Sequence, residues 1–146
     1  MSMEAASKLN SEASVIGSIC IDAASFPVAE RMLRAEDFCE AKAALAFEVA
    51  LRLHSSGKPI DPVAIAESLG AGGAEYIAGC MEATPTASNI ALYCEGVING
   101  SKRRKMSELA DRLGDGSFDF SADPDEVFEY VRSEIDGVKS TGSDII

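Results

Sequence analysis

The sequence predicts an all-α protein in which a compact helical bundle is followed by a protruding antiparallel helical hairpin. Apolar residues recur at spacings of three and four along most of the chain, whereas strand-like alternation does not recur. Helix-starting pairs of a capping residue and a proline occur at Asp61-Pro62, Thr84-Pro85 and Asp123-Pro124. The 47% apolar share includes only 6% aromatic residues, so a core of Ala, Leu, Ile and Val favours close-packed helices.

The first half of the chain predicts short helices in a single domain of ordinary size. Val15 and Ile19 belong to one apolar stripe, and a second helix over residues 26–33 follows Pro27. Residues 41–54 carry two apolar rows, which predicts a central helix that is covered on most sides and ends near Gly57.

The next segments begin and end on strong local signals. Asp61 is a predicted N-cap, and Gly70 stops the helix that follows Pro62. A short helix is expected over residues 74–83. Thr84 and Pro85 predict the start of a long helix that continues to Gly114.

The last two helices predict a hairpin that associates with a second copy. Asp123 caps the final helix, whose apolar positions are spaced 3, 4 and 3 as in a coiled-coil seam. We expect a disordered arm over 1–9, a globular subdomain over 10–85, the hairpin over 86–139 and the start of a linker over 140–146. The predicted self-association residues are Met106, Leu109, Leu113, Phe128, Val131, Ile135 and Val138.

Four consecutive basic residues, 102–105, interrupt a chain whose formal net charge is -11. On a helix they spread around the whole circumference and no aromatic residue lies between them, which argues against a nucleic-acid groove. A solvated face, or salt bridges to the acidic final helix, is the simplest interpretation. The alternative is docking to an acidic protein surface, for which we single out Lys102, Arg103 and Lys105.

Composition predicts a cytoplasmic protein without catalytic chemistry of its own. There is no phosphate loop, and His54 at the end of an apolar helix favours a capping or half-buried role. The four cysteines form no C-x-x-C pair and are expected to be small buried residues. No apolar run is long enough for a membrane span, and the N-terminus lacks signal-peptide order. We therefore expect no cofactor, no metal and no membrane partner.

Several segments, taken in order, resemble the N-terminal domain of DnaB-type bacterial replicative helicases over residues 10–113. The resemblance lies in Glu12 with 15–17 and Asp22, in 36–38 followed by Phe47, in Gly57–Asp61, in Thr84-Pro85 with 87–90 and Tyr93, and in Val97 and Arg104. Asn10, Cys39 and Ala43 depart from the family pattern, which suggests a divergent or phage-like member.

This resemblance implies an all-α domain whose hairpins pair between subunits and help six of them form a two-tiered ring. It also implies docking of primase and, in some systems, of a helicase loader. From the net charge and the basic cluster we expect no direct contact to nucleic acid. The ATP- and magnesium-dependent motor of such proteins would follow a linker. An alternative is a free-standing regulator that mimics this domain and modulates helicase assembly or loading.

Overall fold

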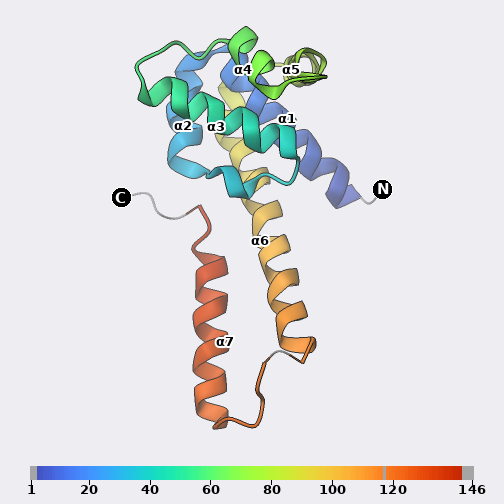
Figure 1. Ribbon diagram of the computed structural model, residues 1–146, viewed down its shortest axis with the longest axis vertical. Helices are drawn as coiled ribbons and strands as arrows, with labels where there is room; N and C mark the ends of the chain where they lie inside the picture. Colours follow the sequence, from blue (N-terminus) through green and yellow to red (C-terminus); the bar gives the residue numbers. More distant parts are fainter. Residues whose placement is uncertain (1–2, 117, 143–146) are drawn as a thin grey trace.

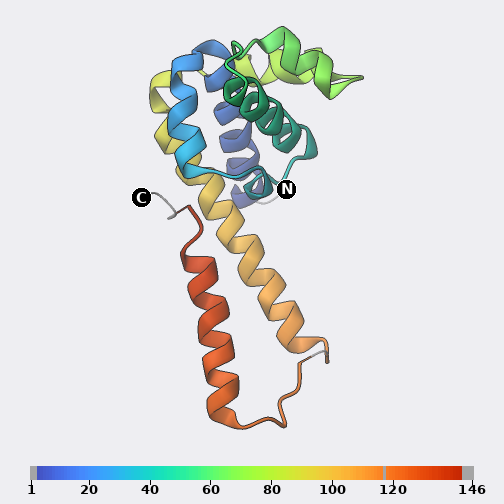
Figure 2. The same cartoon turned by 60° about the vertical axis from the view of Figure 1, so that its left-hand side comes forward.

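The computed structural model describes residues 3–116 and 118–142, which form helices and connecting loops. The helices are α1 (Met3–Ile21), α2 (Phe26–Met32), α3 (Ala41–Ser55), α4 (Pro62–Leu69), α5 (Gly73–Glu82), α6 (Ile90–Gly114) and α7 (Pro124–Lys139), with short 3-10 helices η1 (Ala23–Ser25), η2 (Ala35–Asp37) and η3 (Ala87–Asn89). The second half of α6 and all of α7 project away from a bundle formed by the other helices (Figures 1 and 2). The predicted all-α fold is confirmed.

The core of the bundle is centred on α1, not on α3 as the sequence predicts. Helix α1 contacts α2, α3, α5 and α6, and its residues Val15, Ile16 and Ile19 have no exposed surface. Helix α3 contributes Phe47, which lies between Phe26 and Phe38 at ring-centroid distances of 5.8 and 5.2 Å. Before its C-terminal end, α3 is exposed only on the side that carries Glu48 and Arg52, so the helix is covered on most sides, as its two apolar rows predict.

A buried carboxylate and a glycine join α1 to distant parts of the chain. Glu12 is 1% exposed, and its carboxylate accepts backbone hydrogen bonds from Cys39 at 2.8 Å and Glu40 at 2.9 Å. At Gly17, a Cβ atom would lie 2.3 Å from the Cys80 carbonyl oxygen, so α5 approaches α1 more closely than any other residue type would allow. The glycine and the buried carboxylate therefore both serve packing.

Helix α1 begins at Met3, so it includes residues 3–9, for which the sequence analysis expects a disordered arm. This stretch is rich in Ala, Glu, Lys and Leu, which are good helix formers. Residues 1–2 lie outside the described residues. At the other end Thr141 is 8% exposed and belongs to the packed structure, whereas residues 143–146 of the predicted linker lie outside the described residues.

Two local predictions also need correction. Thr84 does not start the long helix, because its hydroxyl donates to the Cys80 carbonyl at 2.7 Å and so completes the last turn of α5. Thr86 instead caps η3 by accepting from the Ser88 amide at 3.1 Å, and α6 begins at Ile90. Of the four cysteines, Cys39 is exposed because it lies in the loop before α3.

No single helix in the described ranges is long and apolar enough to cross a membrane. Only Ser11–Ile21 together with Ala23–Met32 meets those limits, across a 119° bend. The same described residues contain no group of three or more His, Cys, Asp or Glu side chains that could hold a metal ion.

Candidate functional site

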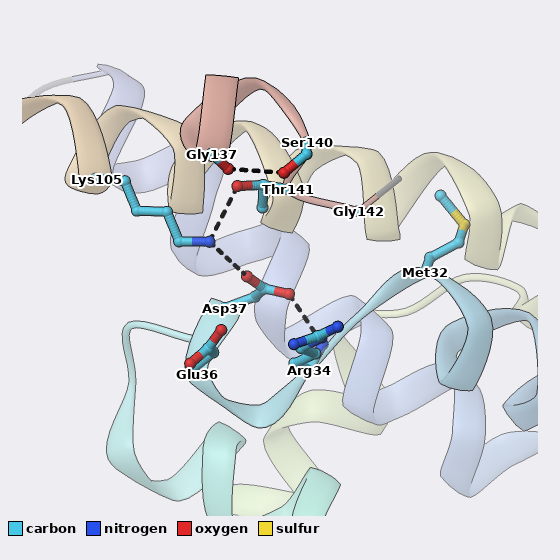
Figure 3. A pocket seen from close by; sticks show the side chains of 9 residues that line it. All are labelled: Met32, Arg34, Glu36, Asp37, Lys105, Gly137, Ser140, Thr141 and Gly142. Carbon is cyan, nitrogen blue, oxygen red and sulfur yellow. Dashed lines mark hydrogen bonds and ion pairs between the residues drawn. The ribbon is translucent and has the colours of Figure 1, made fainter. Parts of the chain in front are cut away.

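The hairpin is attached to the bundle through a buried carboxylate, Asp37, which is 2% exposed (Figure 3). Its two oxygens accept from the Ser101 hydroxyl at 2.7 Å and from the Arg34 amide at 2.9 Å. The Lys105 ammonium lies 3.9 Å from the carboxylate and donates to the Thr141 hydroxyl at 3.0 Å. Asp37 and Lys105 therefore connect η2, the middle of α6 and the end of α7.

Arg104 reinforces the same attachment. Its Nη2 atom donates to the backbone carbonyls of Glu36 at 3.2 Å and Asp37 at 3.0 Å. Gly142 has a φ of +77°, and a Cβ atom there would lie 2.7 Å from Ile98 Cδ1, so the segment after α7 is pressed against α6. A cleft of about 250 Å³ remains between η2, Lys105 and this segment.

The basic residues 102–105 thus divide into two pairs. Arg104 and Lys105 hold the base of the hairpin to the bundle, and neither forms the predicted salt bridge to α7. Lys102 is half-buried and Arg103 is exposed. Of the predicted docking set, Lys105 contacts Asp37 and Thr141 within the chain, Lys102 is half-buried, and Arg103 is the exposed member.

The arm of the hairpin has its own small apolar core. Leu109 on α6 is 4% exposed, and α7 is the element alongside this part of α6 (Figure 2). The half-buried residues of α7 are Val127, Val131, Glu134, Ile135 and Val138, and its other residues are exposed. The predicted seam therefore lies at least partly against α6 of the same chain, and Leu109 is an internal residue.

The side of α6 that flanks Leu109 is apolar on one edge and charged on the other. An α-helix advances about 100° per residue, so Met106 and Leu113 lie to one side of Leu109 and Arg112 lies to the other. Met106 is 46% exposed and Leu113 is half-buried.

Helix α7 has the same division. Phe128 and Ile135 lie to one side of Val131, and Glu134 lies to the other. Arg112 and Glu134 form an ion pair with a nitrogen–oxygen distance of 3.0 Å, so the charged edges of the two helices meet on one face of the hairpin. The opposite face, which we call the open face, comprises Met106, Leu113, Phe128 and Ile135.

Exposure on the open face is greatest at Phe128, where 64% of the residue is accessible. Of the seven predicted self-association residues, Met106 and Phe128 are exposed, Leu113, Val131, Ile135 and Val138 are half-buried, and Leu109 is buried. The structure thus brings the predicted residues together on one hairpin and separates those that hold it together from those that face outward.

An aromatic cluster at the end of the hairpin was not predicted. The Phe118 ring lies 4.9 Å from both Phe120 and Tyr130 between ring centroids. Phe120 is 61% exposed and Tyr130 is 40% exposed. Phe118 and Phe120 lie in the loop between the helices, where helical periodicity gives no signal, so only the bare F-x-F pattern could have pointed to them.

Comparison with known proteins places this architecture in a family. Residues 4–99 match the family described as the DnaB-like helicase N terminal domain. The chain belongs to this family. The match confirms the resemblance inferred from the sequence, and it ends within α6, before the arm of the hairpin begins.

Among individual DnaB relatives, the replicative DNA helicase DnaB of Geobacillus stearothermophilus is 28% identical over 117 residues, which cover 75% of this chain and 26% of that protein. The DnaB of Treponema pallidum is 25% identical over 134 residues, which cover 87% of this chain and 31% of that protein. The chain therefore spans about a quarter to a third of the length of these relatives.

A solved DnaB structure has the same fold. The crystal structure of the N-terminal domain of the DnaB helicase from Mycobacterium tuberculosis superposes with a TM-score of 0.74 at 26% identity. The superposition covers 87% of this chain and 94% of that one. Since 87% of 146 residues exceeds the length of the bundle, the likeness extends into the hairpin.

Proposed function

We propose that this chain is the non-catalytic N-terminal domain of a replicative DNA helicase, and that its hairpin mediates association of the helicase subunits, up to a hexamer in the complete protein. The observation that carries the proposal is the open face, where Phe128 and Met106 remain exposed on an arm that projects from the bundle. Family membership supplies the helicase context. Any ATP and magnesium would belong to a motor elsewhere in such a protein.

The free energy gained by covering Phe128 can be compared with the cost of bringing two copies together. A fully buried phenylalanine removes about 150 to 250 Å² from water, so covering the exposed part of Phe128 contributes roughly 2 to 4 kcal/mol at about 25 cal/mol per Å². A twofold dimer doubles this, but association costs about 4 to 15 kcal/mol. Two copies of Phe128 contribute about 4 to 8 kcal/mol, which covers only the lower part of that range, so a stable dimer also draws on the half-buried members of the open face.

We also propose that the base of the hairpin docks a protein partner of the replication machinery, primase or a helicase loader. Lys102 and Arg103 offer positive charge there, and Met106 offers adjacent apolar surface. Replacing Arg103 by Glu is expected to weaken binding of the cognate primase or loader in a titration at low salt. Unchanged binding of both proteins would remove these residues from the docking proposal.

Sedimentation velocity over a range of concentrations tests self-association. The wild-type chain is expected to form a dimer or larger species as concentration rises. Phe128→Asp should raise the dissociation constant at least tenfold, since it removes apolar contact and buries a charge. Phe128 is a better position for this substitution than Val131 or Ile135, because those two half-buried residues also pack inside the hairpin.

Ser133→Asp is the matched control. Ser133 is exposed on α7 and lies about 200° from Val131, on the side turned away from α6. The Ser133→Asp substitution introduces the same charge as Phe128→Asp and should leave sedimentation unchanged. Circular dichroism would verify that both variants remain helical. A wild-type chain that stays monomeric at several hundred micromolar, or equal effects of the two variants, would refute the proposed interface.

A further inference from the structure

We propose that the tip of the hairpin is a second interaction surface, which binds a basic segment bearing apolar side chains from a partner protein. This tip patch consists of Phe118, Phe120 and Tyr130. Nothing in the proposed self-association requires it, because it lies apart from the open face. Tyr130 and Phe128 differ by about 200° around α7, so their side chains leave the helix on different sides.

The rings of the tip patch are held in place and yet exposed. Phe118 is half-buried and contacts both of the other rings, with centroids 4.9 Å apart in each case. Phe120 and Tyr130 nevertheless remain 61% and 40% exposed. Rings that are already positioned lose little conformational freedom when a partner covers them. This combination is typical of the aromatic anchors found in protein interfaces.

The loop that carries the patch is shaped by local hydrogen bonds. Asp119 accepts from the Ser121 amide at 2.8 Å, and the hydrogen bonds from Ser121 lower the pKa of the Asp119 carboxyl. Asp123 caps α7 by accepting from the Asp125 amide at 3.2 Å. The Asp119 carboxyl is therefore anionic at neutral pH, and Asp119 and Asp123 both belong to the acidic segment that carries the rings.

The charge around the tip patch specifies the partner. No Lys or Arg occurs between Arg112 and Arg132, and that interval contains six acidic residues, namely Asp115, Asp119, Asp123, Asp125, Glu126 and Glu129. Arg132, just beyond the interval, lies 3.6 Å from Glu129. A surface of this kind repels phosphate backbones and attracts lysine and arginine side chains. Apolar side chains between those cations would cover the rings.

A second copy of this chain is a poorer occupant. Its apolar surface on α4 and α5, around Val63 and Met81, is bordered by Glu67, and further acidic residues of α5 are exposed, so it would face the tip with like charge. Of its four clustered basic residues, Arg104 and Lys105 are used to hold its own hairpin. The charge pattern thus favours a different protein.

Binding of a designed probe tests this inference. The probe is a fluorescently labelled amphipathic peptide of Leu and Lys at helical spacing, and its matched control carries Glu in place of every Lys. In fluorescence anisotropy titrations at physiological salt, the wild-type chain is expected to bind the Leu/Lys peptide and not the Leu/Glu peptide. Affinity should fall as salt is raised, because exposed charges are screened within about 8 Å at 0.15 M.

Variants localise the binding. The double variant Phe120→Ser, Tyr130→Ser should weaken the Leu/Lys peptide about tenfold or more. Leu92→Ser is the matched control, because Leu92 is 64% exposed and lies in the first turn of α6, at the opposite end of this helix from the tip. Both changes are at exposed positions and should leave the helical circular dichroism unchanged.

Three outcomes would overturn the inference. They are absence of binding by the Leu/Lys peptide, equal binding of the Leu/Glu peptide, and tip and Leu92 variants that behave alike. Sedimentation of the tip variant separates the two surfaces. Self-association that survives the tip variant supports a separate function for the tip, whereas its loss would assign the tip to contacts between copies of this chain and would also overturn the inference.

Discussion

Replacing Asp37 by Ala should loosen the attachment of the hairpin and cost about 3 kcal/mol of unfolding free energy. The carboxylate is 2% exposed and satisfies the Ser101 hydroxyl, which has no exposed surface, and the Arg34 amide. A buried donor left without a partner costs about 1 to 3 kcal/mol. The Lys105 ion pair adds less than about 1 kcal/mol, because the lysine side chain is 33% exposed and solvent screens it.

Urea denaturation followed by circular dichroism measures this loss. With a denaturant dependence of about 1 to 3 kcal/mol per molar urea, the midpoint should fall by roughly 1 to 3 M. Glu36→Ala is the matched control, since Glu36 is exposed and only its backbone carbonyl contacts Arg104. A shift for Asp37→Ala no larger than that of Glu36→Ala would refute the reasoning.

A double-mutant cycle sharpens the same prediction. Ser101→Ala removes the donor that Asp37 satisfies, so the double variant should lose less stability than the sum of the two single variants. The coupling should reach at least about 0.5 kcal/mol for residues in direct contact. Strict additivity would mean that the 2.7 Å hydrogen bond between these residues contributes nothing to the fold.

Two further predictions concern the bundle. Gly17→Ala places a Cβ atom 2.2 Å from the Thr84 hydroxyl oxygen and should lower the free energy of unfolding by about 1 to 3 kcal/mol, seen as a lower thermal midpoint. Gly79→Ala, whose new Cβ atom has nothing within 4 Å, should raise the thermal midpoint slightly. Burial raises the pKa of three thiols: Cys20 to about 12, Cys80 to about 11 and Cys94 to about 12. These values exceed the ordinary thiol pKa of 9.0, so above pH 9 the unfolded chain loses thiol protons that the folded chain keeps. The free energy of unfolding should therefore not change through these thiols below pH 9 and should fall progressively towards pH 11. Urea midpoints that stay level up to pH 11 would contradict this.

Helix positions were predictable from sequence wherever the signal was local. Asp61 and Asp123 cap their helices through hydrogen bonds to residues two positions on, as their sequence context predicts. Thr84 precedes a proline in the same way, but its hydroxyl is taken by α5. The choice between these two uses depends on how the preceding chain is placed, and a capping pattern carries no information about that.

The functional surfaces were predictable only in part, for a related reason. Helical spacing groups Leu109 with Met106 correctly, but it cannot tell which residue faces α7 of the same chain and which faces outward. The basic cluster fails similarly, because Arg104 and Lys105 find partners in η2, more than 60 residues earlier in the chain. Long-range pairing of this kind leaves no local pattern in the sequence.

The distribution of exposed apolar residues explains why the hairpin, and not the bundle, is the element to test first. Among the described residues, seven large hydrophobic side chains are exposed, and four of them, Met106, Phe120, Phe128 and Tyr130, lie on the hairpin. The other three, Ile21, Val63 and Leu92, are on separate helices of the bundle. Isolated exposed apolar residues are ordinary in a folded domain, whereas grouped ones mark contact surfaces. Since α6 is a single helix from the core to the arm, the Asp37 attachment at its middle sets where both hairpin surfaces are presented.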